Sequence, residues 1–114
     1  MHELSICAAL LGQVASTVQS HGARRVTRIV LRLGALSGVE PALLQAAYAQ
    51  AGIGTPAENA ELVIVDVPIR IRCRDCAVES DAAVNRLRCP ACGGAETTLI
   101  SGDEMMLETV DIVF

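Results

Sequence analysis

Aromatic side chains and lysine are scarce in this 114-residue chain. It contains no tryptophan, one tyrosine and one phenylalanine, and all nine of its basic residues are arginines. A hydrophobic core must therefore rely on leucine, isoleucine and valine. Few rings are present to stack on nucleic-acid bases, and the net charge of −4 disfavours a protein whose main task is to neutralise phosphate.

Long apolar runs are also missing. No stretch approaches the roughly 18 apolar residues that predict a membrane helix. The apolar segment 4–11 is short, lacks a basic leader and continues with helical periodicity, so we interpret it as mature protein and not as a signal peptide. We expect a cytoplasmic protein that binds neither membrane nor nucleic acid.

The cysteines that are present form a metal-binding pattern. Cys73-x2-Cys76 and Cys89-x2-Cys92 are separated by twelve residues. Each tight turn directs two sulfurs at one centre, and two such turns complete a tetrahedron with metal–sulfur bonds of about 2.3 Å. The spacing predicts a zinc site. Because four sulfurs close the coordination shell, we expect a structural role for this zinc.

Three other interpretations of the cysteines are weaker. Two disulfides fit poorly with an odd total of five cysteines and a reducing compartment. A rubredoxin-like iron centre would normally lie among aromatic residues. A catalytic metal site would need a histidine–carboxylate cluster beside the cysteines, so we do not expect an enzyme.

The hydrophobic pattern predicts two helices and three strands. Apolar residues at three- and four-residue steps predict a helix from Leu4 to Val18 that stops at Gly22, and a second helix is expected from Pro41 to about Gly52. Strands are expected at 26–33, 62–65 and 104–114. Because 62–65 is apolar on both faces, we expect it to be a central strand covered by helices.

This order predicts an α+β fold in which two helices pack on a small three-stranded mixed sheet, with an inserted zinc-ribbon-like module that carries the four paired cysteines. We expect residues 1–69 plus 102–114 to form one α/β domain and 70–101 to form the zinc-binding module. Pro68 and Gly102 are candidate hinges between them. A module of this size cannot build a sufficient core, so its metal should supply the folding energy.

The start of the chain, Met1-His2-Glu3, is a second candidate metal site. A terminal amine, the amide nitrogen of His2 and its imidazole can close adjoining chelate rings around one ion, and such nitrogen-rich ligation suits Ni(II) or Cu(II). Alone this signal is weak, because an early histidine is more often solvent-exposed.

Several motifs occur together and in order: Met1-His2-Glu3-Leu4-Ser5, the turn from Gly34 to Pro41, the two cysteine pairs and the segment 101–104. The chain thereby resembles the HypA/HybF family, the nickel-insertion accessory proteins of [NiFe]-hydrogenase maturation. The resemblance covers essentially the whole chain. It implies a small metallochaperone that hands nickel to the hydrogenase large subunit, and possibly serves urease maturation, with help from a GTPase partner.

The resemblance also implies site residues. Nickel would be bound by His2, with the Met1 amine and the backbone at His2 and Glu3 as further ligands, and zinc by Cys73, Cys76, Cys89 and Cys92. Nickel is then transported cargo and zinc a structural ion. We expect a monomer or a weak homodimer.

An alternative from a different class is a zinc-ribbon adaptor that binds nucleic acid or protein. Five arginines surround the cysteines, but acidic residues lie among them, so we interpret this region as a solvated face. Two further residues have structural interpretations. Cys7 is expected in the core of the first helix, and His21 at free carbonyls of its last turn.

Overall fold

The computed structural model describes residues 2–114 of the chain, with side chains from Glu3 onward. The helices are α1 (His2–His21) and α2 (Pro41–Ala51), with a short 3₁₀ helix, η1 (Ala35–Ser37), before α2. The strands are β1 (Arg25–Gly34), β2 (Glu61–Val67), β3 (Arg70–Cys73), β4 (Glu79–Asp81), β5 (Thr97–Ser101) and β6 (Met105–Val113). Both predicted helices and all three predicted strands are confirmed.

The helical core follows from the apolar spacing of the sequence. Residues at three- and four-residue steps along α1 are buried, among them Cys7, Val14 and Val18, and they face the same core as Leu44 of α2. The Cys7 thiol lies 3.7 Å from the Leu44 carbonyl oxygen, which joins the two helices. Helix α2 begins at proline, whose fixed φ suits the first helical position.

The loop after α2 is held by the only tyrosine of the chain. The Tyr48 hydroxyl donates to the Ala60 carbonyl oxygen at 3.2 Å, and the Gln45 amide donates to the Leu62 carbonyl oxygen at 2.7 Å. These bonds connect α2 to the start of β2. The hydroxyl of the buried tyrosine thus has a hydrogen-bond partner, as buried polar groups usually do.

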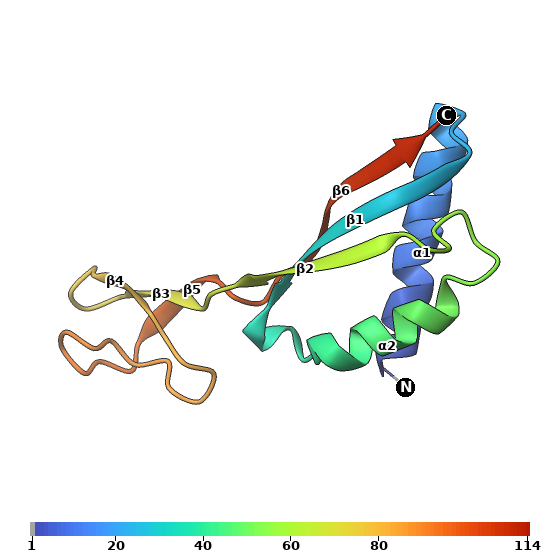
Figure 1. Cartoon of the computed structure of the whole chain (residues 1–114). Coiled ribbons are helices and arrows are strands. Elements are labelled where there is room, and N and C mark those ends of the chain that lie inside the picture. Colours follow the sequence, from blue (N-terminus) through green and yellow to red (C-terminus); the bar gives the residue numbers. More distant parts are fainter. Residues whose placement is uncertain (1) are drawn as a thin grey trace. The chain divides into compact units, whose positions relative to one another are not determined.

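The larger sheet has the strand order β2-β1-β6. Strands β1 and β2 run in the same direction and β6 runs in the opposite one (Figure 1), so the sheet is mixed as predicted. The expectation that 62–65 is a central strand was wrong. Strand β1 is central and β2 is an edge, where Val63, Ile64 and Val65 are only half-buried. Their β-branched side chains fit a half-covered sheet surface as well as a fully covered one.

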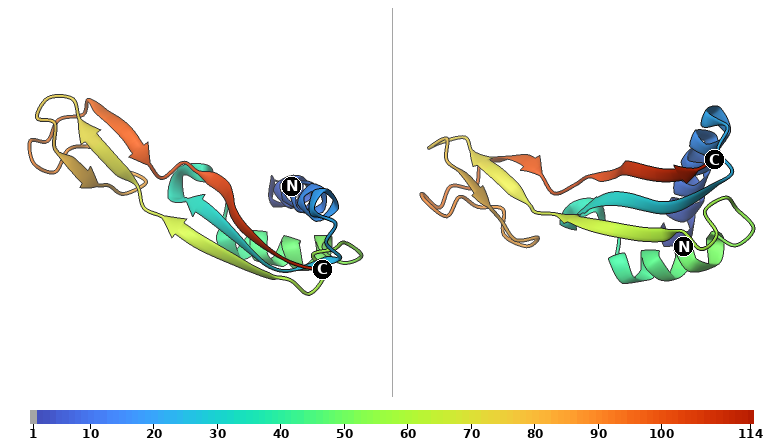
Figure 2. Two further views of the ribbon diagram at one scale, coloured as in Figure 1. Left: turned by 90° about the horizontal axis from the view of Figure 1, so that it is seen from above. Right: turned by 45° about the horizontal axis from the view of Figure 1, so that its top comes forward.

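The cysteine-containing segment forms a second sheet with the order β4-β3-β5. Strand β3 pairs antiparallel with both neighbours (Figure 2). Of residues 70–101, only Ile71, Cys73 and Cys89 are buried apolar residues. A core this small cannot hold three short strands by hydrophobic burial alone.

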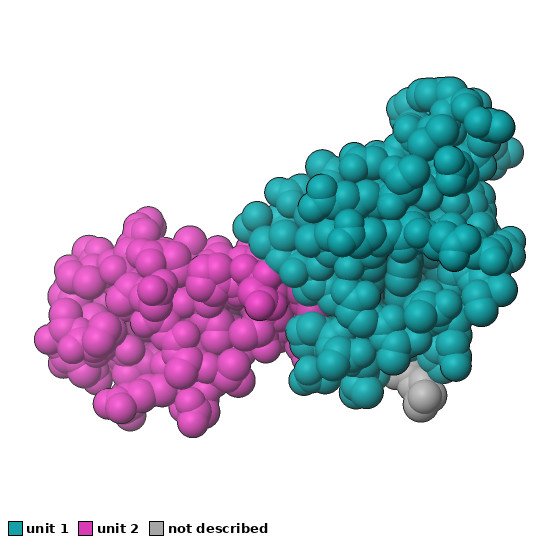
Figure 3. Space-filling view, in the orientation of Figure 1, with its two compact units in different colours: residues 1–32, 39–65, 106–114 teal, residues 33–38, 66–105 magenta. Residues whose placement is uncertain are grey.

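The chain divides into two compact units (Figure 3). Unit 1 comprises Met1–Arg32, Val39–Val65 and Met106–Phe114, and unit 2 comprises Leu33–Gly38 and Asp66–Met105. Unit 2 therefore contains the cysteine segment and also the turn after β1. The functional assignment of the two predicted domains stays a prediction. Neither helix of the described chain is both long and apolar enough to span a bilayer.

Within unit 2, two glycines allow a close backbone crossing. A Cβ atom on Gly34 would lie 2.1 Å from the Gly102 carbonyl oxygen, and Gly102 itself has φ +116°. The crossing is closed by hydrogen bonds from Gly34 N–H to the Glu104 carbonyl oxygen (2.8 Å) and from Leu36 N–H to the Gly102 carbonyl oxygen (2.7 Å). No other residue type fits at Gly34 without movement of the backbone.

We predict that Gly34→Ala lowers the free energy of unfolding by about 1–3 kcal/mol, because the added methyl group must displace backbone. Urea denaturation of the metal-loaded protein measures this. Gly12→Ala is the matched control. A Cβ there meets nothing within 4 Å, and the change should raise stability by about 0.5–1 kcal/mol through higher helix propensity. Equal stability of the Gly34→Ala variant and the wild type would contradict the crossing.

Candidate metal centre

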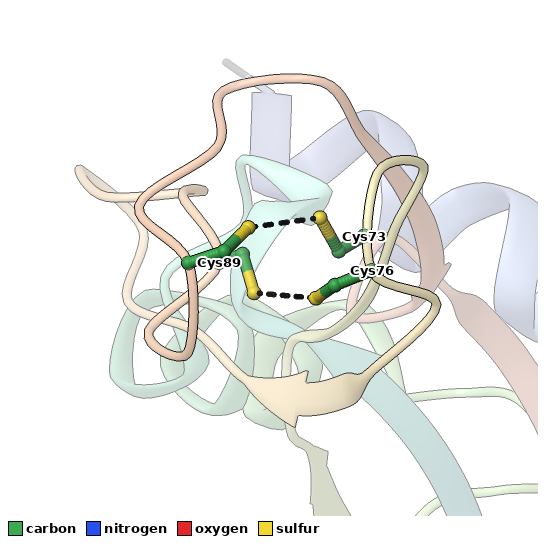
Figure 4. A group of neighbouring side chains, drawn as sticks. Cys73, Cys76 and Cys89 are labelled. Atoms are coloured by element: carbon green, nitrogen blue, oxygen red, sulfur yellow. Dashed lines mark hydrogen bonds between the residues drawn. The ribbon is translucent and has the colours of Figure 1, made fainter.

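The four paired cysteines meet at one point of unit 2. Their Sγ atoms all lie within 4.8 Å of one another, and Figure 4 shows the sulfurs directed toward a common centre. The Cys73 and Cys92 sulfurs are 3.5 Å apart, and those of Cys76 and Cys89 are 3.6 Å apart. A disulfide would need about 2.05 Å, whereas the edges of a tetrahedron with 2.3 Å bonds are about 3.8 Å. The spacing therefore fits four ligands of one metal ion.

Two loops of the same construction position these sulfurs. In the first, Cys73 N–H donates to the Val78 carbonyl oxygen and Ala77 N–H donates to the Cys73 carbonyl oxygen, both at 3.0 Å. In the second, Cys89 N–H donates to the Gly94 carbonyl oxygen at 3.0 Å and Gly93 N–H to the Cys89 carbonyl oxygen at 2.8 Å. Each pair of hydrogen bonds closes a turn that presents both cysteines to the same side.

Both loops require a left-handed residue directly after their second cysteine. Gly93 has φ +74°, as the glycines of the sequence suggest, but the equivalent position of the first loop is Ala77, with φ +64°. Sequence reasoning did not anticipate Ala77, because alanine rarely adopts this conformation. Alignment of the two cysteine pairs on each other would have found it, since Ala77 and Gly93 then occupy the same position.

The backbone also approaches the sulfurs closely at Gly94. A Cβ atom there would lie 3.3 Å from the Cys92 sulfur and 3.0 Å from an Asp75 carboxylate oxygen. A side chain at this position would thus crowd the sulfur cluster. Gly94 is therefore needed because there is no space for a side chain, and Gly93 because of its positive φ angle.

Backbone N–H groups prepare the cysteines unequally for ionisation. The N–H of Cys92, aided by that of Ala91, lowers the pKa of the Cys89 thiol to about 7. The Gly94 N–H lowers the pKa of Cys92, but the neighbouring thiols and burial outweigh it and raise that pKa to about 12. Four thiolates cannot form together here unless a cation lies among them. Metal binding must therefore displace protons and weaken as pH falls.

The donor set fits a thiophilic divalent ion in a closed site. Four sulfur ligands leave no position for a substrate or for a metal-bound water. Cys73 and Cys89 are buried, while Cys76 and Cys92 are exposed at the rim. The arrangement can hold the fold of unit 2 together.

The second predicted site lies largely outside the described residues. This applies to Met1 and to the side chain of His2. Glu3 is half-buried in the first turn of α1 and lines a shallow cavity of about 340 Å³ between α1 and α2, together with Leu4 and Leu43. The nickel ligands predicted from the sequence therefore stay a prediction.

Two other sequence interpretations are confirmed. Cys7 is fully buried in the core, and burial, reinforced by the charge of Glu3, raises the pKa of its thiol. An inert core cysteine is thus the correct interpretation. The His21 Nδ1 atom lies 2.9 Å from the Thr17 carbonyl oxygen in the last turn of α1, as expected for a helix-terminal histidine.

Comparison with known proteins agrees with this architecture. A protein-family model described as hydrogenase/urease nickel incorporation, metallochaperone, HypA matches residues 1–112. Hydrogenase maturation factor HypA of Nitrosospira multiformis is 42% identical over 113 residues, which cover 99% of this chain and 98% of that protein. Two solved structures share the fold.

The first of these is the solution structure of a HypA protein, with a TM-score of 0.74 and 23% identity over 99% of this chain and 97% of that one. The second is the solution structure of the Ni metallochaperone HypA from Helicobacter pylori, with a TM-score of 0.68 and 21% identity over 97% of each chain. At these identities the likeness supports the fold alone.

We predict that the chain binds one equivalent of Co²⁺ with the thiolate-to-metal absorption of a four-sulfur site, and that Cys76→Ser weakens this binding by about tenfold or more because it removes one thiolate. The cobalt charge-transfer band measures both. Cys7→Ala is the control and should bind cobalt as the wild type does, since Cys7 lies in the helical core. Full-strength cobalt binding by the Cys76→Ser variant would contradict a four-cysteine site.

Proposed function

Because this chain belongs to the HypA family of hydrogenase/urease nickel-incorporation metallochaperones, we propose that it binds Ni(II) at its N-terminus and delivers it to the large subunit of [NiFe]-hydrogenase. The observation that carries the proposal is the family match, which begins at residue 1 and so includes Met1-His2-Glu3. Proteins of this family are metallochaperones and not enzymes, and nickel is accordingly cargo and not a cofactor.

The proposed nickel ligands are the His2 imidazole, the Met1 amine and the backbone nitrogens of His2 and Glu3. Helix α1 begins at His2, and the first four N–H groups of a helix have no carbonyl partner within it. Deprotonation of these amides therefore breaks no helical hydrogen bond. The positive end of the helix disfavours a cation, and the Glu3 carboxylate in the first turn offsets that effect.

We assign Zn(II) to Cys73, Cys76, Cys89 and Cys92. Zinc suits a closed tetrahedral set of thiolates and has no redox chemistry of its own. The two ions would then have different tasks. Zinc stays bound and holds unit 2, whereas nickel at a chain end can be transferred by stepwise exchange of ligands with an acceptor.

In the cell, a GTPase nickel-insertion partner would act with the protein. Urease maturation is a second destination for nickel, and the family description names it. We place the protein in the cytoplasm, where thiolate ligands stay reduced. Its form there would be a monomer or a weak homodimer, and neither nucleic acid nor membrane would be a partner.

We predict that untagged protein binds one Ni²⁺ per chain and that His2→Ala abolishes this binding while zinc stays bound. Native mass spectrometry and metal analysis give both stoichiometries. His21→Ala is the matched control, because it removes the only other histidine of the chain and should leave nickel binding unchanged. Stoichiometric nickel in the His2→Ala variant would exclude the proposed site.

A second prediction concerns the terminal amine. One glycine added before Met1 moves the amine away from the His2 imidazole, so it should change the nickel absorption spectrum and weaken binding by about tenfold or more. One glycine added after Phe114 is the control. If the two extended proteins gave the same spectrum and affinity, the amine would not be a ligand.

A further inference from the structure

The arginines around the metal centre fall into two groups. The β3 segment carries Arg70, Arg72 and Arg74 at every second position, and each of the three has an acidic partner within unit 2. Arg70 pairs with Asp81 at 2.7 Å, Arg72 with Glu79, and Arg74 with Glu96 at 3.9 Å. The first two pairs lie directly opposite each other across β3 and β4. The charges of these three arginines are thus offset locally.

Arg86 and Arg88 are different, because neither has an acidic partner among the described residues. No hydrogen bond or ion pair within that part of the chain involves the Arg86 side chain. Arg88 makes one bond, from Nη1 to the Gly93 carbonyl oxygen at 3.3 Å, which leaves its charge unpaired. Within the described segment 70–101, these are the two uncompensated positive charges.

Both of these arginines line one cavity of about 430 Å³ beside the second cysteine loop. Its other lining residues are Asp81, Ala82, Ala83, Cys89, Pro90 and Gly93. The single carboxylate, that of Asp81, is already bonded to Arg70. We call this cavity the arginine pocket. Its volume suits a few side chains of a bound segment.

We propose that the arginine pocket binds an acidic, aliphatic segment of a partner protein. Arg86 and Arg88 both line this concave site, and the guanidinium group of an arginine can form paired hydrogen bonds with a carboxylate. Val84 and Leu87, which neighbour the pocket residues in sequence, are exposed apolar side chains that can contact aliphatic groups. The inference concerns a partner surface and holds independently of nickel binding.

The composition of unit 2 argues against a nucleotide in the same pocket. Residues 33–38 and 66–105 contain no aromatic side chain that could stack on a base. The whole chain is acidic, with a net charge of −4, so general attraction of anions is weak. An acidic partner would be recognised through the pocket itself and not through the field of the whole protein.

A purely structural role for the two arginines is the competing explanation. A divalent metal with four thiolates carries a net charge of −2, and Arg88 is already bonded to the loop that holds Cys89 and Cys92. If charge compensation were their only task, substitution of both arginines would speed metal loss without any effect on a bound peptide. The two explanations therefore differ in what they predict for peptide binding.

The probe is a fluorescent peptide that alternates glutamate and leucine, titrated into zinc-loaded full-length protein and followed by anisotropy. We expect saturable binding that weakens with salt and shifts the amide signals of residues 81–93. Arg86→Gln/Arg88→Gln should weaken binding by about tenfold or more. Arg72→Gln/Arg74→Gln removes the same charge from paired positions and is the matched control, expected within about twofold of wild type.

A second variant tests the pocket without changing either arginine, so that damage to the metal centre cannot account for a loss of peptide binding. Ala83→Glu adds a negative charge at an exposed position of the pocket, keeps both arginines and all four cysteines, and should also weaken the peptide by about tenfold or more. Zinc content is measured for every variant.

Three results would overturn the proposal: no binding of the peptide to wild type, equal losses in the Arg72/Arg74 control, or unchanged binding after Ala83→Glu. Binding of inorganic phosphate in place of the peptide would identify a small-anion site and would also overturn it. Loss of nickel binding in the His2→Ala variant bears on the proposed function and leaves these results unaffected.

Discussion

Four sulfur atoms within 4.8 Å of one another are the constraint on which unit 2 depends. Without a cation their protons cannot all leave, and the pKa values of Cys89 and Cys92 already diverge to about 7 and about 12. With a metal ion, two loops and three short strands are fixed around one point. Since Ile71 is the only buried aliphatic residue of 70–101, we expect metal binding and folding of this segment to be one process.

The sequence predicted those elements whose signal is local. Both helices follow from apolar periodicity and from Pro41, and the metal site follows from cysteine spacing. The position of β2 could not be predicted, because Val63 and Val65 form the same apolar run on a half-covered edge as in a covered centre. Strand β3 is not predicted from the sequence although Arg70-Ile71-Arg72-Cys73 alternates, because a run of four residues is too short for a pattern of period two to be distinctive.

The crossing of Gly34 and Gly102 could not be predicted either, because it joins segments far apart in the sequence. The sequence marks both positions only as glycines in turns. Their contact brings the turn 34–38 into the same unit as the cysteine segment, so two of the motifs that carry the family resemblance meet in one place. The sulfur site has two buried and two exposed ligands and a coordination shell that four thiolates would close, which suits an ion that stays bound.

The two cysteine loops are alike in hydrogen bonding but unequal in backbone energy. Ala77 occupies the left-handed conformation that Gly93 adopts freely, at a cost of about 1 kcal/mol. Both loops have an exposed outer cysteine, Cys76 in the first and Cys92 in the second, so the backbone is what distinguishes them. The loop of Cys73 and Cys76 costs more backbone energy to form, and it would therefore depend more than the other loop on the metal ion that its two cysteines would help to hold.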